Sequence, residues 1–150
     1  MDAKDFMTTN VITCKEDCSV KEAAQVMLDN SFSVLPVVDS SENLVGILTE
    51  SDFVGKELEV PHALASIKQL FGQSFNVGDI ELIYNKAKGK KVSEVMSKNL
   101  ITANPETSLD RIVNMIISKN LKRVPIVNEQ KIVGIITRKN LIRAFVKNDI

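Results

Sequence analysis

Two short motifs carry the residues of this chain that are best suited to bind a ligand. Thr49 and Asp52 form the first motif, and Thr137 and Asn140 form the second, with the same spacing. Each motif is expected where a strand leads into a helix, whose first backbone amides favour an anion. A carboxylate such as that of Asp52 can accept hydrogen bonds from both hydroxyls of a ribose. Both motifs also suit a simple helix cap, and this alternative stays open.

The two motifs differ in charge. Arg123, with Lys122 beside it, can bind a phosphate through two hydrogen bonds, whereas Val34 stands at the corresponding place before the first motif. Asn140 stands where the first motif has Asp52, and a charge-assisted hydrogen bond is about twice as strong as a neutral one. The second motif therefore favours phosphate, and the first favours an uncharged or cationic group.

No residue pattern predicts catalysis or a metal centre. Cys14 and Cys18 are the two cysteines, and His62 is the single histidine. Two thiols cannot complete a tetrahedral metal site, so we expect reduced, structural cysteines. Because no nucleophile–base pair is evident, an enzyme is the weakest interpretation, and no catalytic cofactor or metal is expected.

The composition narrows the class of protein further. The chain has 150 residues, of which 44% are hydrophobic and 25% charged, and its 19 basic residues balance 19 acidic ones. A nucleic-acid partner is not expected, because such partners usually require a basic surface. No apolar run reaches the length of a membrane span, and residues 1–15 lack a signal pattern, so a cytoplasmic location is the default.

A duplication positions the two motifs. The phrase "LVGILTESDFV" at residues 44–54 recurs as "IVGIITRKNLI" at residues 132–142. The match extends over residues 1–56 and 92–148, so we divide the chain into a first repeat (1–56), an insert (57–91) and a second repeat (92–150). Matching residues lie 89 positions apart before the central turn and 88 apart after it: Met7/Met96, Ile12/Ile101, Thr13/Thr102, Ser19/Ser108, Pro36/Pro125, Gly46/Gly134 and Thr49/Thr137.

Each repeat predicts the order β-α-β-β-α. "NVIT" and "NLIT" suit a brief strand, and apolar spacing predicts helices over residues 20–28 and 109–117, the first with a capping box at Ser19 and Glu22. "VLPVVD" with "LVGILT", and "VPIVN" with "IVGIIT", predict hairpins in which Gly46 and Gly134 permit a close backbone approach. A last helix is expected near Ser51 or Lys139. One repeat is too small for a core, so the two should pack together and form equivalent clefts.

The pieces "M…vit", "lPVvd" and "vGilT-x-x-D" resemble the paired CBS domains (cystathionine β-synthase domains), together called a Bateman module. The resemblance covers both repeats and implies a mixed α/β (α+β) fold, with two β-α-β-β-α repeats about a pseudo-twofold axis. It implies a stand-alone regulatory sensor that binds AMP, ADP, ATP, S-adenosylmethionine or a related adenosyl ligand as effector. It also implies a homodimer that signals to a regulated protein.

The resemblance also implies which residues hold the ligand. The backbone flanking Thr13 or Thr102 would read the adenine edge, and apolar neighbours would clamp the base. Pro36 and Pro125 have an alternative role, because proline limits strand pairing at an edge. The expected ligand-binding residues are Ile12, Thr13, Val34, Pro36, Thr49 and Asp52 in the first repeat, and Ile101, Thr102, Lys122, Arg123, Val124, Pro125, Thr137 and Asn140 in the second.

The insert and the departures from the family pattern leave a second hypothesis open. Residues 57–91 predict two short helices, with Leu64, Ile67 and Phe71 at helical spacing and Gly89 as a stop. Their apolar side chains would pack on the module itself or on a second subunit. The alternative function is a ligand-free structural or dimerisation module with degenerate clefts, which Val34 and Asn140 favour.

Overall fold

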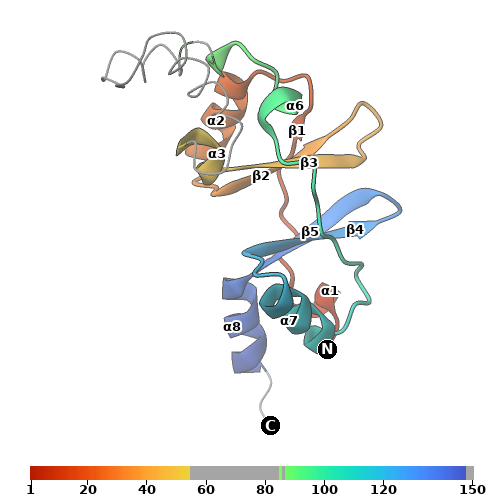
Figure 1. Cartoon of the computed structure of the whole chain (residues 1–150). Helices are drawn as coiled ribbons and strands as arrows, with labels where there is room; N and C mark the ends of the chain where they lie inside the picture. Colours follow the sequence, from red (N-terminus) through yellow and green to blue (C-terminus); the bar gives the residue numbers. More distant parts are fainter. Residues whose placement is uncertain (55–84, 86, 148–150) are drawn as a thin grey trace. The chain divides into compact units, whose positions relative to one another are not determined.

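The computed structural model describes residues 1–54, 85 and 87–147 (Figure 1). Both repeats contain helices and strands, which confirms the predicted α+β class. None of the helices in these ranges has the length and hydropathy needed to span a bilayer. The insert helices expected around Leu64, Ile67 and Phe71 lie outside the described residues. The elements are α1 Ala3–Phe6, β1 Cys14–Lys15, α2 Val20–Asp29, β2 Val34–Val38, β3 Leu44–Thr49, α3 Glu50–Val54, α6 Val92–Val95, α7 Leu109–Ser118, β4 Arg123–Asn128, β5 Lys131–Thr137 and α8 Arg138–Lys147.

The chain forms two compact units, and neither is a continuous segment. The second-repeat unit contains Met1–Ile12, Ser41–Leu44 and Asn99–Ile150, and the first-repeat unit contains Thr13–Ser40 and Val45–Lys98. The boundaries 1–56 and 92–150 mark the two sequence repeats, and the two compact units do not follow these boundaries. The segment that leads into each repeat belongs to the unit built around the other repeat.

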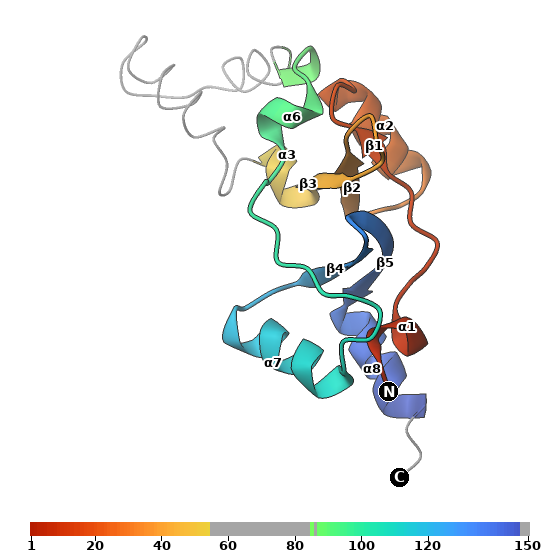
Figure 2. The ribbon, with the colours of Figure 1, turned by 90° about the vertical axis from the view of Figure 1, so that its right-hand side faces the viewer.

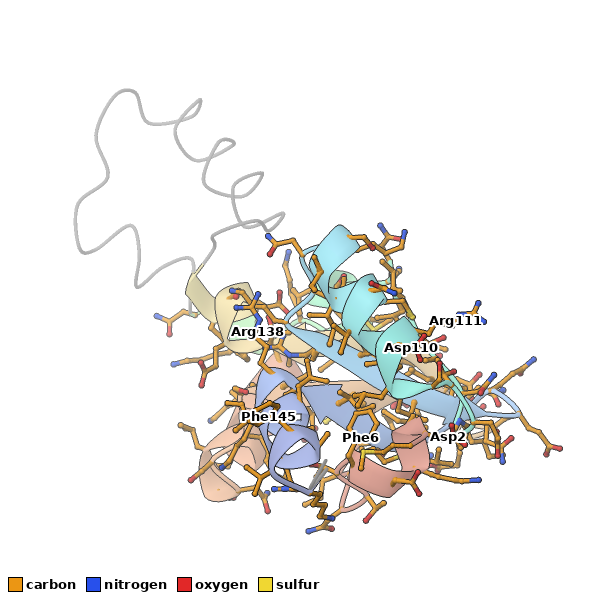
Figure 3. All side chains as sticks on the ribbon, turned by 90° about the horizontal axis from the view of Figure 1, so that it is seen from below. Asp2, Phe6, Asp110, Arg111, Arg138 and Phe145 are labelled. Carbon is orange, nitrogen blue, oxygen red and sulfur yellow. The ribbon has the colours of Figure 1, made fainter. Side chains whose placement is uncertain are left out.

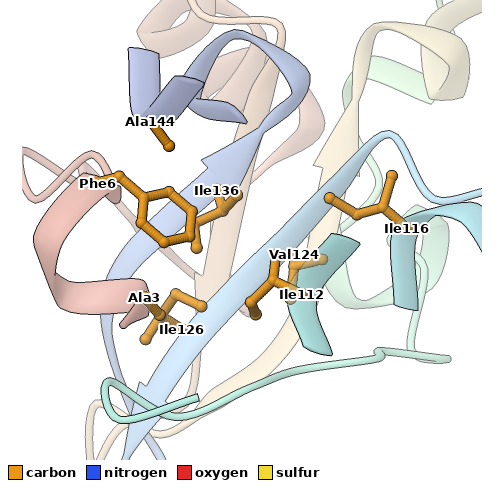
Figure 4. Close-up of a cluster of buried hydrophobic side chains, with 8 residues drawn as sticks. All are labelled: Ala3, Phe6, Ile112, Ile116, Val124, Ile126, Ile136 and Ala144. Carbon is orange, nitrogen blue, oxygen red and sulfur yellow. The ribbon is translucent and has the colours of Figure 1, made fainter. Parts of the chain in front are cut away.

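In the second-repeat unit, three helices cover one face of a two-stranded sheet. β4 and β5 pair antiparallel with a register shift between Ile126 and Val127, and α1, α7 and α8 lie on the same face of this hairpin (Figure 2). Ile112 and Ile116, one helical turn apart on α7, point into the core, as the apolar spacing predicts. Figure 4 shows the complete buried cluster, which consists of Ala3, Phe6, Ile112, Ile116, Val124, Ile126, Ile136 and Ala144.

Helix α1 is held by this unit and could not be stable alone, because it has four residues. Ala3 and Phe6 are buried in the core, and the Ala3 amide donates to the Thr107 carbonyl at 2.8 Å. Beyond the helix, Thr8 and Ile135 exchange two backbone hydrogen bonds of 2.9 and 3.0 Å. The leading segment therefore extends the β4–β5 layer and closes the core.

The first-repeat unit contains a three-stranded sheet in the order β1-β2-β3. The predicted helix is confirmed as α2, and so is its capping box, because the Glu22 amide donates to Ser19 Oγ at 3.1 Å and the Ser19 amide donates to Glu22 Oε2 at 3.2 Å. The first strand lies later than the predicted "NVIT" run, since its parallel ladder begins where Cys14 faces Val37. The matching segment of the second repeat forms a single parallel bridge, between Ala103 and Ile126.

A methionine from the exchanged segment lies on a strand glycine in each unit. A Cβ atom added to Gly46 would overlap Met96 Sδ and lie 2.8 Å from Met96 Cγ. A Cβ atom added to Gly134 would overlap Met7 Sδ and lie 3.1 Å from the Thr8 carbonyl oxygen. Both strand glycines therefore admit a close approach, and the group that approaches each of them belongs to a leading segment.

The end of the insert rejoins the first-repeat unit through α6. Ala87 and Lys88 are helical, and Gly89 lies in the turn that follows, where the sequence predicts the stop. The Val92 amide then donates to the Cys18 carbonyl at 2.8 Å, and the Val92 side chain is fully buried. Helix α6 thus occupies in this unit the place that α1 occupies in the other.

Candidate functional site

The second motif lies at the junction of β5 and α8 and is closed by hydrogen bonds. Thr137 is the last residue of β5, and both its amide and its hydroxyl donate to Asn140 Oδ1 at 2.9 Å. Asn140 is 2% exposed, and its Nδ2 donates to the Phe6 carbonyl at 2.8 Å and to Thr8 Oγ1 at 3.1 Å. The predicted spacing therefore does produce a cap, and the amide also reaches the leading segment.

The cationic residues of the second motif lie beside Thr137. Arg123 pairs with Thr137 in the β4–β5 ladder, and its side chain is half-buried. Lys122 is exposed, whereas Val124 and Pro125 are buried. The structure thus brings Arg123 and Thr137 together and leaves Lys122 at the surface.

The predicted adenine-reading segment of the second repeat runs alongside β4. The Ala103 amide donates to the Pro125 carbonyl at 3.1 Å, and the Val127 amide donates to the Ala103 carbonyl at 2.8 Å. Ile101 is half-buried and Thr102 is exposed. The carbonyl oxygen of Pro125 therefore already accepts a hydrogen bond from this segment.

The first motif lies at the junction of β3 and α3. The Thr49 amide donates to Asp52 Oδ2 at 2.7 Å, and both side chains are half-buried. The Glu50 amide donates to the Ser33 carbonyl at 3.2 Å, which fixes the junction next to the start of β2. Asp52 is thus a helix cap whose carboxylate is held at a defined place, and a cap of this kind is compatible with a ligand role.

The remaining predicted residues of the first repeat divide between the two units. Thr13, Val34 and Pro36 belong to the first-repeat unit, together with the first motif, and Ile12 belongs to the second-repeat unit. Val34 and Thr13 are half-buried, and Pro36 is buried. β1 pairs with Val37 and Val38, so Pro36, which has no amide hydrogen, lies just outside that ladder.

The cysteines are protonated thiols and do not form a reactive pair. Cys14 is 8% exposed, and burial raises its pKa to about 11. Burial, the hydrogen bond to Glu22 and the charge of Glu22 together raise the pKa of Cys18 to about 12. Cys18 Sγ donates to Glu22 Oε2 at 3.0 Å. Within the described ranges, no three His, Cys, Asp or Glu side chains gather where they could hold a metal ion.

A separate cleft of about 390 Å³ lies inside the second-repeat unit. It opens between α7, the loop that precedes α7 and the β4–β5 turn, and Thr102 is the predicted site residue that reaches it. No sequence pattern pointed to this cleft, because its charged residues, Arg111 and Glu129, belong to no motif. Its lining consists of Thr102, Ala103, Asn104, Thr107, Arg111, Met115, Val127, Glu129 and Gln130.

Known proteins resemble the chain over both repeats. A model of the CBS domain matches residues 3–59 and 92–147, which confirms the predicted resemblance. A structure of CBSX2 in complex with AMP is 25% identical and has a TM-score of 0.70, covering 97% of this chain and 96% of that one. The CBS domain pair of protein MJ0100, in complex with 5′-methylthioadenosine and S-adenosyl-L-methionine, is 27% identical and has a TM-score of 0.69, covering 99% and 98%.

Curated relatives are longer than this chain. CBSX2 of Arabidopsis thaliana is 26% identical over 149 residues, and the match covers 93% of this chain and 61% of that protein. L-aspartate semialdehyde sulfurtransferase of Methanocaldococcus jannaschii is 28% identical over 143 residues, which are 95% of this chain and 23% of the enzyme. The chain therefore corresponds to one part of each of these relatives.

Proposed function

Because the chain belongs to the CBS-domain family, we propose that it is a regulatory module that binds an adenosyl ligand and signals to a partner protein. The observation that carries the proposal is the half-buried Asp52 carboxylate, held 2.7 Å from the Thr49 amide where β3 leads into α3. Support comes from the neighbouring structures that contain AMP or 5′-methylthioadenosine and S-adenosyl-L-methionine. The ligand is an effector and not a catalytic cofactor.

Each motif has a separate role in this proposal. Asp52 accepts hydrogen bonds from the ribose hydroxyls, and the backbone around Thr13 reads the adenine edge. Arg123, which lies opposite Thr137 in the β4–β5 ladder, pairs with phosphate. Since a charge-assisted hydrogen bond contributes about 1.5–3 kcal/mol, each contact corresponds to roughly ten- to hundredfold in affinity.

Calorimetry with adenosine and ATP tests this division of roles. Asp52→Ala should weaken the binding of adenosine, because it removes the ribose acceptor. Arg123→Ala should weaken ATP far more than adenosine, because only ATP carries phosphate. Lys122→Ala is the matched control, since this neighbouring cation is exposed and should have a smaller effect on ATP. Equal losses of adenosine and ATP affinity in Arg123→Ala would refute the phosphate role.

The regulatory role includes three further proposals. The chain acts without catalysis of its own, although relatives such as the sulfurtransferase carry this region in an enzyme. The protein that it regulates is a separate chain or another part of a longer one. Its cytoplasmic location stays a prediction.

The second candidate function is that of a structural module that forms a homodimer and binds no ligand. Exposed apolar side chains on α8 favour it. Phe145, which is labelled in Figure 3, is 82% exposed, and Ile142 and Val146 on the same face are 65% and 68% exposed. Leu28 and Ile117, which match in the two repeats, are 74% and 73% exposed. A thermal-shift series with AMP, ATP and S-adenosylmethionine separates the candidates, because a ligand bound only to the folded state must stabilise it.

A further inference from the structure

The cleft of about 390 Å³ in the second-repeat unit combines two opposite charges with apolar surface. Arg111 on α7, which Figure 3 labels, and Glu129 at the β4–β5 turn line it with exposed side chains. Met115 and Val127 add half-buried apolar surface. Within residues 1–54, 85 and 87–147, neither charged group forms an ion pair with another side chain, so both can pair with a ligand.

Pro105 explains why the cleft opens in this repeat. In the first repeat, the Glu16 amide donates to the Val38 carbonyl at 2.9 Å and continues the pairing of β1 with β2. The residues 89 positions later are Pro105 and Val127, and proline has no amide hydrogen to donate. Pairing in the second repeat therefore stops at Ala103, and the chain turns at Pro105 instead.

Asn104, which also lines the cleft, is held in one orientation by its neighbours. Its Oδ1 accepts hydrogen bonds from the Glu106 amide and from Thr107 Oγ1, both at 3.1 Å. No residue that the structure describes accepts a hydrogen bond from its Nδ2. This nitrogen and the guanidinium of Arg111 are both donors, which suits a carboxylate.

The β4–β5 turn fixes the backbone that carries Glu129. Glu129 and Gln130 have φ values of 51° and 69°, in the left-handed region that residues other than glycine rarely adopt. The Gln130 carbonyl accepts from the Leu44 amide at 2.9 Å, and Lys131 Nζ donates to the Ser41 carbonyl at 2.6 Å. These contacts hold the strained turn, so the Glu129 carboxylate stays at the edge of the cleft.

The first repeat does not have this pair of charges. Glu22 stands 89 positions before Arg111, with the opposite charge. Its carboxylate accepts from Cys18 Sγ at 3.0 Å and from the Ser19 amide at 3.2 Å, so it is engaged within its own helix end. The arrangement at Arg111 and Glu129 therefore occurs once in the described part of the chain.

We propose that this cleft binds a free α-amino acid with an apolar side chain. The carboxylate of the ligand pairs with Arg111 and Asn104, its ammonium group pairs with Glu129, and its side chain packs on Met115 and Val127. Phosphate is disfavoured because Glu129 would repel it. The volume of about 390 Å³ lies within the range of about 300–1,000 Å³ that small-molecule sites occupy.

The site goes beyond the proposed adenosyl-binding function. Of the residues expected to bind the adenosyl ligand, Thr102 lines the cleft, whereas Arg123, Thr137 and Asn140 do not. The amino acid is therefore a second effector, which binds without displacing the first.

Nuclear magnetic resonance titration of the whole, isotope-labelled chain tests the site with L-methionine as the probe. L-methionine should bind with a Kd of about 1 mM or below and shift the amides of Asn104, Thr107 and Glu129. L-methioninamide lacks the carboxylate, and N-acetyl-L-methionine lacks the ammonium charge. Each analogue should bind about five- to tenfold more weakly, the loss expected for one exposed charge pair.

Variants assign each charge to one end of the ligand. Arg111→Gln should weaken L-methionine about five- to tenfold but change L-methioninamide by less than about twofold, because that analogue lacks the group that Arg111 binds. Glu129→Gln should show the same contrast between L-methionine and N-acetyl-L-methionine. Arg143→Gln on α8 and Glu106→Gln are the matched controls, since both residues are exposed and neither lines the cleft. Both controls should change the L-methionine affinity by less than about twofold.

The outcomes separate this inference from the proposed function. Equal binding of L-methionine and its two analogues, or no amide shift at about 10 mM L-methionine, would overturn the inference and leave the proposed function standing. Displacement of L-methionine by 5′-methylthioadenosine would show that the cleft is part of the adenosyl site and would also overturn the inference. Binding of L-methionine by a chain that binds no adenosyl ligand would support the inference and overturn the proposed function.

Discussion

Replacing the strand glycines with alanine should destabilise the two units unequally. In Gly46→Ala, the new methyl group meets the side chain of Met96, with Cγ at 2.8 Å and Cε at 3.1 Å. In Gly134→Ala, it meets the side chain of Met7 and, in addition, the Thr8 carbonyl oxygen at 3.1 Å. A methionine can rotate away, whereas that carbonyl is fixed, because it accepts a hydrogen bond from the Ile135 amide.

The magnitudes follow from these contacts. Overpacking a well-packed site costs about 1–3 kcal/mol, and alanine regains about 0.5–1 kcal/mol over glycine within a strand. Gly46→Ala should therefore lower the free energy of unfolding by about 0–2.5 kcal/mol. Gly134→Ala should lie at or above the top of that range. Gly89→Ala is the control, since a Cβ atom there meets nothing within 4 Å, and it should change the free energy by less than about 0.5 kcal/mol.

Urea denaturation of a double-mutant cycle measures whether the methionine is the cause. Met96→Ala removes the side chain that the methyl group introduced by Gly46→Ala would strike, so the glycine substitution should cost about 1–3 kcal/mol less in that background. Met7→Ala should relieve Gly134→Ala less completely, because the Thr8 carbonyl remains. A coupling energy below about 0.5 kcal/mol between Gly46→Ala and Met96→Ala would refute the packing explanation.

Three further predictions concern pH, capping and assembly. Cys14 and Cys18 have pKa values of about 11 and 12 in the folded chain against a usual 9.0, so the folded state retains protons that the unfolded state releases. Stability should fall as the pH rises above about 9, and a variant with both cysteines changed to alanine should show a flatter profile in urea denaturation; equal slopes would contradict the shifts. Ser19→Ala should lower the free energy of unfolding by about 1 kcal/mol, and Ser108→Ala by less, because Ser108 makes no side-chain cap hydrogen bond; thermal denaturation showing equal losses would contradict this. Phe145→Glu should convert the proposed dimer to a monomer in light scattering with an unchanged circular dichroism spectrum. A native chain that stays monomeric at every concentration would refute the proposed dimer.

The periodicity of apolar residues predicts the long helices but not the short ones. The apolar spacing of the ten-residue helices α2 and α7 is long enough to reveal a helical period. Helices α1 and α6 have four residues each, which is about one turn, so they show no period and were not predicted. Their formation depends on burial in a unit that is distant in sequence, and a local pattern does not carry that information.

The contacts of the candidate site also divide into local ones, which the sequence predicts, and ones between distant residues, which it does not. The contact between Thr49 and Asp52 spans three residues and follows from the local capping pattern, which was open from the start as an alternative to ribose binding. The bond from Asn140 to the Phe6 carbonyl spans 134 residues, and any residue type provides such a carbonyl. No side-chain pattern identifies the Phe6 carbonyl as the partner of Asn140. The sequence therefore shows that asparagine replaces the aspartate of the family pattern, but it does not show which group the asparagine binds.

Because each leading segment packs in the unit of the other repeat, the two units must fold in a fixed order during synthesis at the ribosome. The segments of the first-repeat unit have all emerged once Lys98 is made, but Met1–Ile12 must then wait for β5 and α8, which follow Lys98 in the chain. Until that point the apolar side chains of Ala3 and Phe6 have no core to enter. Nascent chains that stop short of β5 should therefore present this segment to chaperones, and the closing step should be slow, because it joins residues far apart in the chain.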